Sequence, residues 1–333
     1  MVPSSERHVP VLLQDAIRYL NVRAGGTYVD ATLGLGGHAT AIARELGGTG
    51  RFIGFDRDPD ALELARGRFQ ALSDELGERM PQWELHGEPF SAMSRFIAEG
   101  SLDGLLADFG VSSMQLDSAH RGFSFQADGP LDMRMDPRRG ATAEQVVNQA
   151  DEKVLADLIY EFGEERRSRR FARAIVRARP IKSTAQLAKV LSAAAPAMKS
   201  ERGRHQIHPA TRIFQALRIR VNDELGELKA LLEAAPGLLK PGGRLVVISF
   251  HSLEDRLVKD AMREGARVGM YHLDSRKPLT AEEEETDRNP RSRSAKLRAA
   301  ERTDPAAEGA GSAQNKRVKE IGPGSSHHNK RRN

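Results

Sequence analysis

Glycines and an acidic residue stand together near the start of the chain at a spacing that suits ligand binding. The segment 28–38 reads Tyr-Val-Asp-Ala-Thr-Leu-Gly-Leu-Gly-Gly-His, so a short apolar run ends at Asp30 and a glycine turn follows. Because glycine has no Cβ atom, its backbone can turn sharply and come close to a ligand. The free N–H groups of a following helix would point at that ligand. The pattern predicts a strand, a glycine turn and a helix built around a small molecule.

A second acidic residue stands where a ribose acceptor is expected. The apolar run 51–56 ends in Asp56, twenty residues after Gly36. An acid at the tip of the neighbouring strand can accept hydrogen bonds from ribose hydroxyls, which predicts a nucleoside cofactor. Residues 34–39 also fit the dinucleotide pattern G-x-G-x-x-A, so these residues alone leave the choice of nucleoside open. A tight turn with no ligand is the simpler alternative.

Two further strand ends carry residues that could complete such a site. Phe90 follows a predicted strand at 82–86, and Asp108 ends another at 102–108. Ligands of open α/β sheets bind at the carboxyl ends of the strands. Asp30, Asp56, Phe90 and Asp108 are therefore predicted to converge on one crevice. Phe90 could cover a flat base there, and packing in the core is its alternative role.

The elements that must position these residues alternate regularly only as far as residue 115. Strand and helix patterns follow one another up to that point and resume after residue 210, which predicts a doubly wound α/β sheet. The intervening segment opens with a loop rich in Gly, Asp and Arg and continues as helices. We expect a long helix over 210–239, a strand over 244–250 and a last strand near 294–300. The predicted domains are a discontinuous sheet domain (1–115 and 210–302), an inserted helical domain (116–209) and a disordered tail (303–333).

Composition excludes several kinds of chemistry. The chain of 333 residues has no cysteine, which excludes disulfides, thiolate zinc sites and a cysteine nucleophile. The histidines show no H-E-x-x-H spacing, so no metal is predicted. No run approaches the roughly 18 apolar residues of a membrane span, and the first residues lack the apolar core of a signal peptide. The expected location is the cytoplasm.

Positive charge is concentrated in two places. The net charge is +5, yet residues 286–333 hold 12 Lys or Arg against 5 Asp or Glu, so the rest of the chain is slightly acidic. A second cluster, with seven arginines, lies between residues 166 and 179. Such clusters are typical of nucleic-acid binding, although a solvated surface is the ordinary explanation.

Long ordered motifs of the chain resemble one enzyme family. They are Asp30-Ala-Thr-Leu-Gly-Leu-Gly-Gly-His38, Asp108-Phe-Gly-Val-Ser-Ser113, Arg121-Gly-Phe-Ser-Phe125, Asp128-Gly-Pro-Leu-Asp-Met-Arg-Met-Asp136, Ala210-Thr-Arg-Ile-Phe-Gln-Ala-Leu-Arg-Ile-Arg220 and Ile248-Ser-Phe-His-Ser-Leu-Glu-Asp-Arg256. The chain is similar, from about His8 to about Arg302, to the RsmH (MraW) family of bacterial 16S rRNA cytosine-N4 methyltransferases. The resemblance implies a class I (Rossmann-like) S-adenosylmethionine-dependent methyltransferase fold with a helical insertion for substrate recognition. It also implies S-adenosyl-L-methionine as methyl donor and 16S rRNA, or the small ribosomal subunit, as partner, with a decoding-centre cytidine (position 1402) as target.

The resemblance also assigns expected roles to individual residues. The implied cofactor contacts are Gly36, Gly37, His38, Asp56, Phe90, Asp108 and Gln115. Asp56 would hold the ribose, and Phe90 would lie against the adenine. One departure is Phe109, where the family usually has leucine, so local packing is expected to differ there.

Methylation of the exocyclic N4 of cytosine fits a chain without cysteine, because it needs no covalent intermediate. It needs an amine lone pair aimed at the sulfonium methyl, which an acceptor near the N4 hydrogens would help to orient. Asp108, or the backbone carbonyl beside it, could be this acceptor, and Asp108 is the predicted catalytic residue. The target base must be unstacked from the RNA and held by side chains. Ser113, Arg121, Phe123 and His251 are the candidates for that contact.

Three other functions remain open at this point. An NAD-dependent oxidoreductase fits the glycine turn and Asp56, and titration with NAD(H) would test it. A non-catalytic RNA-binding assembly factor would use only the basic segments. A DNA cytosine-N4 methyltransferase would typically carry Pro-Pro-Tyr or Pro-Pro-Trp after Asp108, where this chain has Phe-Gly-Val. Dimerisation is undecided by the sequence.

Overall fold

A single twisted sheet forms the centre of the molecule in the computed structural model, which describes residues 10–195 and 208–304. Within these residues seven strands follow the order β3-β2-β1-β4-β5-β7-β6. Strands β1 to β5 pair in parallel, whereas β7 runs antiparallel to both β5 and β6. The strands are β1 Thr27–Asp30, β2 Arg51–Phe55, β3 Gln82–His86, β4 Leu102–Asp108, β5 Leu239–Ser249, β6 Tyr271–Leu273 and β7 Lys296–Arg302.

Helices cover both faces of this sheet. They are α1 Leu13–Leu20, α2 Gly37–Leu46 and α3 Pro59–Leu76 on one face, and α10 Glu224–Leu238 and α11 Ser252–Arg267 on the other. Successive strand residues point to opposite faces, so Tyr28 packs under the first group and Val29 under the second. Within the described ranges no helix has the length and apolar character needed to cross a membrane. The sheet is thus buried on both faces, as parallel sheets usually are.

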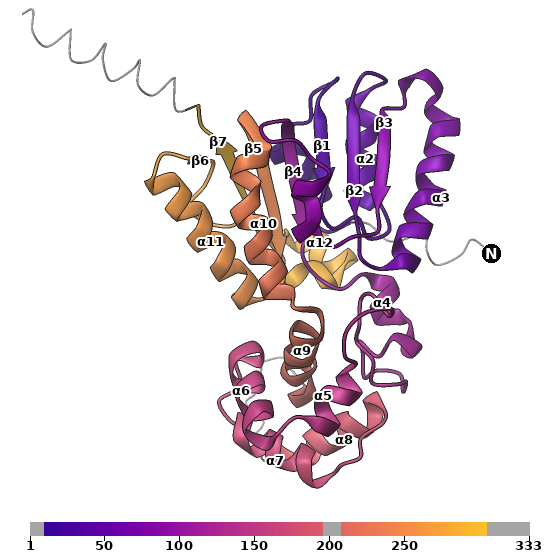
Figure 1. Cartoon of the computed structure of the whole chain (residues 1–333), viewed down its shortest axis with the longest axis vertical. Coiled ribbons are helices and arrows are strands. Elements are labelled where there is room, and N and C mark those ends of the chain that lie inside the picture. Colours follow the sequence, from indigo (N-terminus) through magenta and orange to yellow (C-terminus); the bar gives the residue numbers. More distant parts are fainter. Residues whose placement is uncertain (1–9, 196–207, 305–333) are drawn as a thin grey trace, which may run out of the picture.

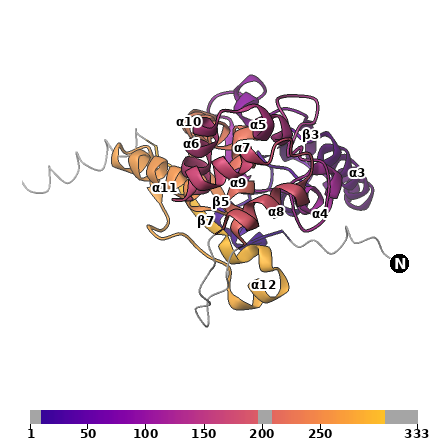
Figure 2. The same ribbon diagram turned by 90° about the horizontal axis from the view of Figure 1, so that it is seen from below.

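A separate hydrophobic core lies beyond the carboxyl ends of the strands. It is built from α5 Ala143–Gln149, α6 Glu152–Gly163, α7 Ser168–Arg177, α8 Thr184–Ala194 and α9 Pro209–Asn222. The arrowheads of β2 and β3 point towards this helical part, with α4 Ser113–Asp117 between them and the helices (Figure 1). Seen from below, the helical part lies across the end of the sheet, and α12 Glu283–Arg288 projects to one side (Figure 2).

The second half of the chain departs from the sequence prediction in three places. The expected continuous helix over 210–239 is wrong, because Asp223 adopts a left-handed conformation (φ 48°) that separates α9 from α10. Strand β5 begins at Leu239, before the predicted start, and its pairing shifts register between Leu102 and Gly104. Strand β6 was not predicted, because three residues give too short a pattern to recognise.

The break between α9 and α10 at Asp223 also affects where the predicted domain boundary falls. Buried residues of α9, among them Ile213 and Leu217, belong to the helical core rather than to either face of the sheet. The predicted boundary at residue 210 therefore falls at the start of α9, while the sheet part resumes with α10. The division into domains remains a prediction. Most of the predicted disordered tail, 305–333, lies outside the described residues.

Candidate active site

A cavity opens at the carboxyl ends of the central strands. It is lined by residues at the end of β4, residues that directly follow β2, the glycine turn, and residues of α4, α10 and α11. Of the predicted site residues, Gly37, His38, Asp56, Phe90, Asp108, Ser113 and Gln115 line it, whereas Gly36, Arg121, Phe123 and His251 do not. Seven of these eleven predicted residues therefore meet at one cavity, and their binding roles remain predictions.

The glycine turn forms one wall. Gly36 precedes α2 in a left-handed conformation (φ 78°), which a side chain would strain, and a Cβ atom on Gly37 would lie only 2.3 Å from Cγ of Pro10. Helix α2 starts at Gly37, so its first backbone N–H groups have no partner within the helix. This end of α2 can receive an anionic group such as a carboxylate.

Asp56 lies beside the turn and fixes its shape. One carboxylate oxygen accepts from the backbone N–H of Gly34 at 2.7 Å, and the other accepts from that of Asp58 at 2.8 Å. Burial raises the pKa of Asp56 to about 6, and its backbone hydrogen bonds oppose that rise. Each oxygen retains a second lone pair, so the carboxylate can also accept from ligand hydroxyls.

Asp30 does not reach the cavity, although its strand end was predicted to join it. The side chain is 1% exposed and accepts from the backbone N–H of Thr32 at 3.0 Å. The hydroxyl of Thr32 in turn accepts from the backbone N–H of Asp108. Burial raises the pKa of Asp30 to about 7. Asp30 thus supports the ends of β1 and β4 from beneath the site.

Asp108 is the strand-end acid that faces the cavity. Its Oδ2 lies 3.6 Å from Nδ1 of His38, while its Oδ1 is buried without a hydrogen-bond partner. Burial raises the pKa of this carboxyl well above its ordinary value, and the negative charges of Asp30 and Glu254 raise it further. A buried acceptor without a donor is costly unless a ligand supplies the donor. The cavity therefore offers a place for an N–H group at Asp108.

Aromatic side chains supply the apolar part of the lining. Phe90 opens a short 3₁₀ turn, Phe90–Arg95, and meets the ring of Phe109 edge to face, with centroids 5.6 Å apart. Both rings line the cavity, so Phe90 can pack in the core and cover a ligand at once. On the other side, Phe250 packs on Gly110, where an added Cβ atom would approach its ring to 3.1 Å.

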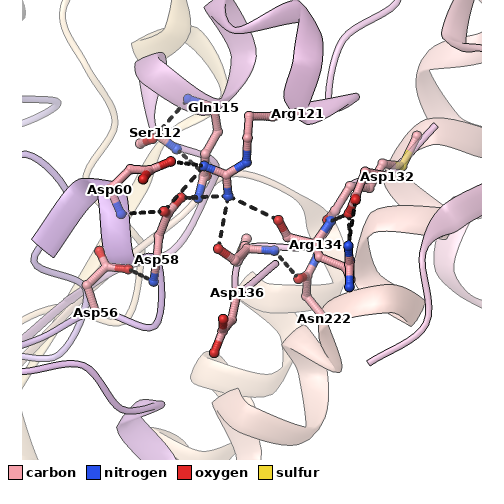
Figure 3. A network of polar contacts seen from close by, with 12 residues as sticks. Asp56, Asp58, Asp60, Ser112, Gln115, Arg121, Asp132, Arg134, Asp136 and Asn222 are labelled. Atoms are coloured by element: carbon pink, nitrogen blue, oxygen red, sulfur yellow. Dashed lines mark hydrogen bonds and ion pairs between the residues drawn. The ribbon is translucent and has the colours of Figure 1, made fainter. Parts of the chain in front are cut away.

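Gln115 and Arg121 belong to one polar network that ties the site to the segment before α5 (Figure 3). Gln115 donates to Asp58 at 2.7 Å, and Arg121 pairs with the same carboxylate at 2.9 Å. Arg121 also donates to the backbone carbonyls of Arg134 and Met135. Its guanidinium is 8% exposed and lies outside the cavity lining, so it holds the walls of the site in place.

Phe123 and His251 are not among the residues that line the cavity. Phe123 is buried in the helical core, and His251 caps α11 by accepting from the backbone N–H of Glu254 at 3.4 Å. Two residues that were not predicted from the sequence, Phe250 and Met135, line the cavity in place of Phe123 and His251. A signal for Phe250 was present, because it directly follows the end of β5, at the same rim as His251. The predicted contacts of Phe123 and His251 with a base remain predictions.

A cluster of charged groups stands at the far side of the cavity. Ligand atoms of Glu224, His251 and Glu254 lie within 4.8 Å of one another, a spacing at which a metal ion could be held. Arg218 already forks onto Glu224 with two hydrogen bonds of 2.8 Å. Glu254 accepts from the backbone N–H of Phe250 at 2.8 Å. These contacts satisfy the carboxylates within the protein, and they make the cluster a rigid, charged boundary of the cavity.

Comparison with known proteins gives a family for this chain. The sequence model described as the MraW methylase family matches residues 5–303. The chain is 73% identical over 297 residues to "Ribosomal RNA small subunit methyltransferase H" of Acidobacterium capsulatum, covering 89% of this chain and 99% of the relative. The protein of the same name from Koribacter versatilis is 62% identical, with 89% and 94% covered.

Similarity to solved structures is weaker. A SAM-dependent O-methyltransferase from Thermotoga maritima aligns with a TM-score of 0.39 and 10% identity, covering 90% of this chain and 68% of the other. Fibrillarin from Aeropyrum pernix, solved with bound S-adenosyl-L-methionine, aligns with a TM-score of 0.37 and 12% identity, covering 86% and 73%. The Rossmann-like α/β fold class predicted for the sheet is confirmed by the strand order itself.

Proposed function

Because this chain belongs to the MraW methylase family, we propose that it transfers a methyl group from S-adenosylmethionine to the exocyclic N4 of a decoding-centre cytidine in 16S rRNA. Methylation of small-subunit ribosomal RNA is the activity named for relatives that are 73% and 62% identical. The choice of cytosine N4 is our finer proposal. We expect the activity where small subunits are assembled, in the cytoplasm.

The observation that carries the finer proposal is Asp108, which lines the cavity and whose buried Oδ1 has no donor. Cytosine presents an N4–H₂ donor, which a carboxylate can accept, whereas uracil presents a carbonyl oxygen in that place. A carboxylate held at the N4 hydrogens would turn the amine lone pair away from the ring and towards a methyl donor. Asp108 is therefore the catalytic residue of the proposal.

The rest of the cavity fits the methyl donor, which supplies a sulfonium methyl group and carries a ribose, an adenine and a carboxylate. The start of α2 at Gly37 would receive the carboxylate. Asp56 would accept from the ribose hydroxyls, and the ring of Phe90 would cover the adenine. The wall at Phe250 and Met135 would be left for the unstacked target base.

Positive charge on the helical part supports an RNA substrate. Between α6 and the end of α7 six arginines are exposed, namely Arg166, Arg167, Arg169, Arg170, Arg173 and Arg177. The opposite side of α7 is buried through Phe171 and Ile175, so the helix presents its arginines outward. Arg179 is used inside the protein, because it donates to the carbonyl of Val147 at 2.8 Å. Exposed arginines of this kind bind phosphates without reading sequence.

The proposal is tested by locating the methyl group. Small subunits from cells that lack this protein are incubated with the purified enzyme and with S-adenosylmethionine bearing a deuterated methyl group. The rRNA is then digested and its nucleosides are separated against N4-methylcytidine, 5-methylcytidine and 2′-O-methylcytidine standards. We expect the label in N4-methylcytidine from one decoding-centre fragment.

Label in another nucleoside would overturn the choice of N4 and leave rRNA methylation standing. Absence of label in free rRNA and in subunits at every assembly stage would overturn the activity itself. Asp74→Asn, an exposed substitution on α3, serves as the control that should transfer methyl groups like the wild type.

A further inference from the structure

His38 is held in one orientation by a backbone contact. Its ring is 5% exposed, and Nε2 lies 3.1 Å from the carbonyl oxygen of Val11. A carbonyl oxygen can only accept, so Nε2 must carry the hydrogen and donate it. In the neutral ring the lone pair then belongs to Nδ1. The fold therefore selects the tautomer of His38 that has its basic nitrogen on the side of Asp108.

That nitrogen faces the carboxylate assigned to the target amine. Nδ1 of His38 lies 3.6 Å from Oδ2 of Asp108, and Oδ1 of Asp108 is the buried oxygen without a donor. A lone pair and a carboxylate oxygen at this distance do not attract each other until a proton lies between them. Hydrogen bonds of a catalytic site are often long without substrate and shorten when it binds. The pair is thus arranged to take up one proton from the cavity.

We propose that His38 accepts, through Asp108, the proton that methyl transfer releases from N4. This inference rests on the proposed function. The N4 lone pair forms the new N–C bond as the C–S bond breaks, and the sulfur keeps that electron pair and becomes a neutral thioether. The methylated nitrogen then bears a positive charge and one proton too many. The carboxylate of Asp108 takes this proton, and Nδ1 of His38 removes it from the carboxyl.

The surrounding negative charges favour a proton held at this pair. Asp30 at the end of β1 and Glu254 on α11 both act on Asp108 through their negative charge. Other charged groups along the cavity are Asp56, Arg57, Arg68, Glu88, Glu224 and Arg291. A proton left on Asp108 would prevent the next amine from being oriented. When His38 takes the proton, it becomes an imidazolium between Asp108 and the carbonyl of Val11, and Asp108 is a carboxylate again. His38 therefore acts as a positioning residue for Asp108 and holds the released proton.

His38→Gln is the sharpest variant. Glutamine can keep an N–H group near the Nε2 position for Val11, but it has no nitrogen that can take a proton. We expect kcat for N4 methylation to fall about 100-fold, in the range typical of proton transfer, with KM for S-adenosylmethionine changed less than about threefold. The rise of the single-turnover rate with pH that a proton-accepting group causes should also disappear.

His272→Gln is the matched control, because His272 is exposed on β6 outside the cavity and should leave both kcat and the pH profile unchanged. A His38→Gln enzyme with raised KM but normal kcat and pH profile would make His38 a cofactor contact only, and overturn the inference. If the His38→Gln variant does not fold, the pH profile of the wild-type enzyme still tests the inference. A single-turnover rate that is flat from about pH 5.5 to about pH 8.5 also overturns it.

These outcomes are distinct from failure of the proposed function. A wild-type enzyme that labels another atom, or no RNA, refutes the function before His38 is tested. A wild type that labels N4, together with a His38→Gln enzyme of normal rate and pH profile, refutes only the role of His38.

Discussion

The guanidinium of Arg121 lies 2.9 Å from the carboxylate of Asp58, which is fully buried, although 63 residues separate the two in the chain. Asp58 caps α3 by accepting from the backbone N–H of Asp60, and it follows Asp56 by two residues. Arg121 in turn holds the carbonyl of Met135, which lines the cavity. One ion pair therefore joins the expected ribose end of the site to the wall expected to meet the target base (Figure 3).

Arg121→Met should destabilise the protein strongly, because it leaves the charge of Asp58 buried without a positively charged partner. We expect a loss of about 3–5 kcal/mol in the free energy of unfolding, measured by urea denaturation. The double variant Arg121→Met with Asp58→Asn should lose less than the sum of the single variants. Arg138→Met is the control: its pair with Asp136 is about half exposed on the arginine side, so the loss should stay below about 1 kcal/mol. Additive losses would contradict the coupling.

Asp108→Asn should remove most methyl transfer while leaving RNA affinity little changed. Asparagine keeps the shape and one acceptor oxygen, but it cannot take the N4 proton. We expect kcat to fall about 10²–10⁴-fold. The affinity of the variant and of the wild type for rRNA fragments is measured by nitrocellulose filter binding. A variant with normal transfer would refute the role given to Asp108, and lost RNA binding would indicate a structural defect.

Asp56→Ala should weaken binding of S-adenosylmethionine, because the proposed ribose acceptor is lost. Hydrogen bonds to a charged group contribute about 1.5–3 kcal/mol, so Kd should rise about 10–100-fold by isothermal titration. The raised pKa of Asp56, about 6, adds a second expectation. Since only the ionised form offers every lone pair, wild-type affinity should fall as pH drops through about 6. Equal affinity at pH 5 and pH 8 would argue against a ribose contact.

The strand ends of the site could be predicted because each depends on a local pattern. Asp56 and Asp108 follow apolar runs at 51–55 and 102–107, and a parallel sheet brings such ends together by its geometry. The burial of Asp30 could not be read in the same way. Asp30 and Asp108 both end a strand, but the side chain of Asp30 does not line the cavity. Its direction depends on contacts with Thr32 and the turn that follows.

The helical part shows the other limit of sequence reasoning. The apolar spacing predicted helices between 142 and 198, and α5 to α8 lie there. The position of Arg121 and Phe123 could not be predicted, because their partners, Asp58 and the helical core, are distant in sequence. Likewise, the break between α9 and α10 depends on the left-handed conformation of Asp223. No glycine or proline at that position of the sequence indicates a break.

Charge reversal on α7 should weaken RNA binding without changing the chemistry. Arg170→Glu with Arg177→Glu places two acids on its exposed side. Each lost phosphate contact should lower the slope of log K against log salt by about 0.7–0.9, and affinity for the small subunit should fall most at low salt. The rate at saturating RNA should remain normal. Arg267→Glu, on the exposed end of α11 and paired with Glu264, is the control expected to leave RNA affinity unchanged.

Asp30→Asn should stabilise the protein at alkaline pH. The carboxyl is buried, and its pKa is raised from 3.8 to about 7 mainly by that burial. The folded state therefore binds a proton at Asp30 more tightly than the unfolded state does. The contribution of this carboxyl to stability is greatest below about pH 4 and is lost as pH rises to about 7. The loss is at most about 4 kcal/mol, since each pKa unit corresponds to about 1.4 kcal/mol.

Asparagine keeps the acceptor for the backbone N–H of Thr32 and has no charge to bury. We therefore expect the Asp30→Asn protein to match the wild type near pH 4 and to melt about 4 °C or more above it at pH 8, by differential scanning calorimetry. Asp157→Asn, at an exposed position of α6, should follow the wild type at both pH values. If Asp30→Asn melts below the wild type at pH 8, the ionised carboxylate contributes more to the fold than its burial costs.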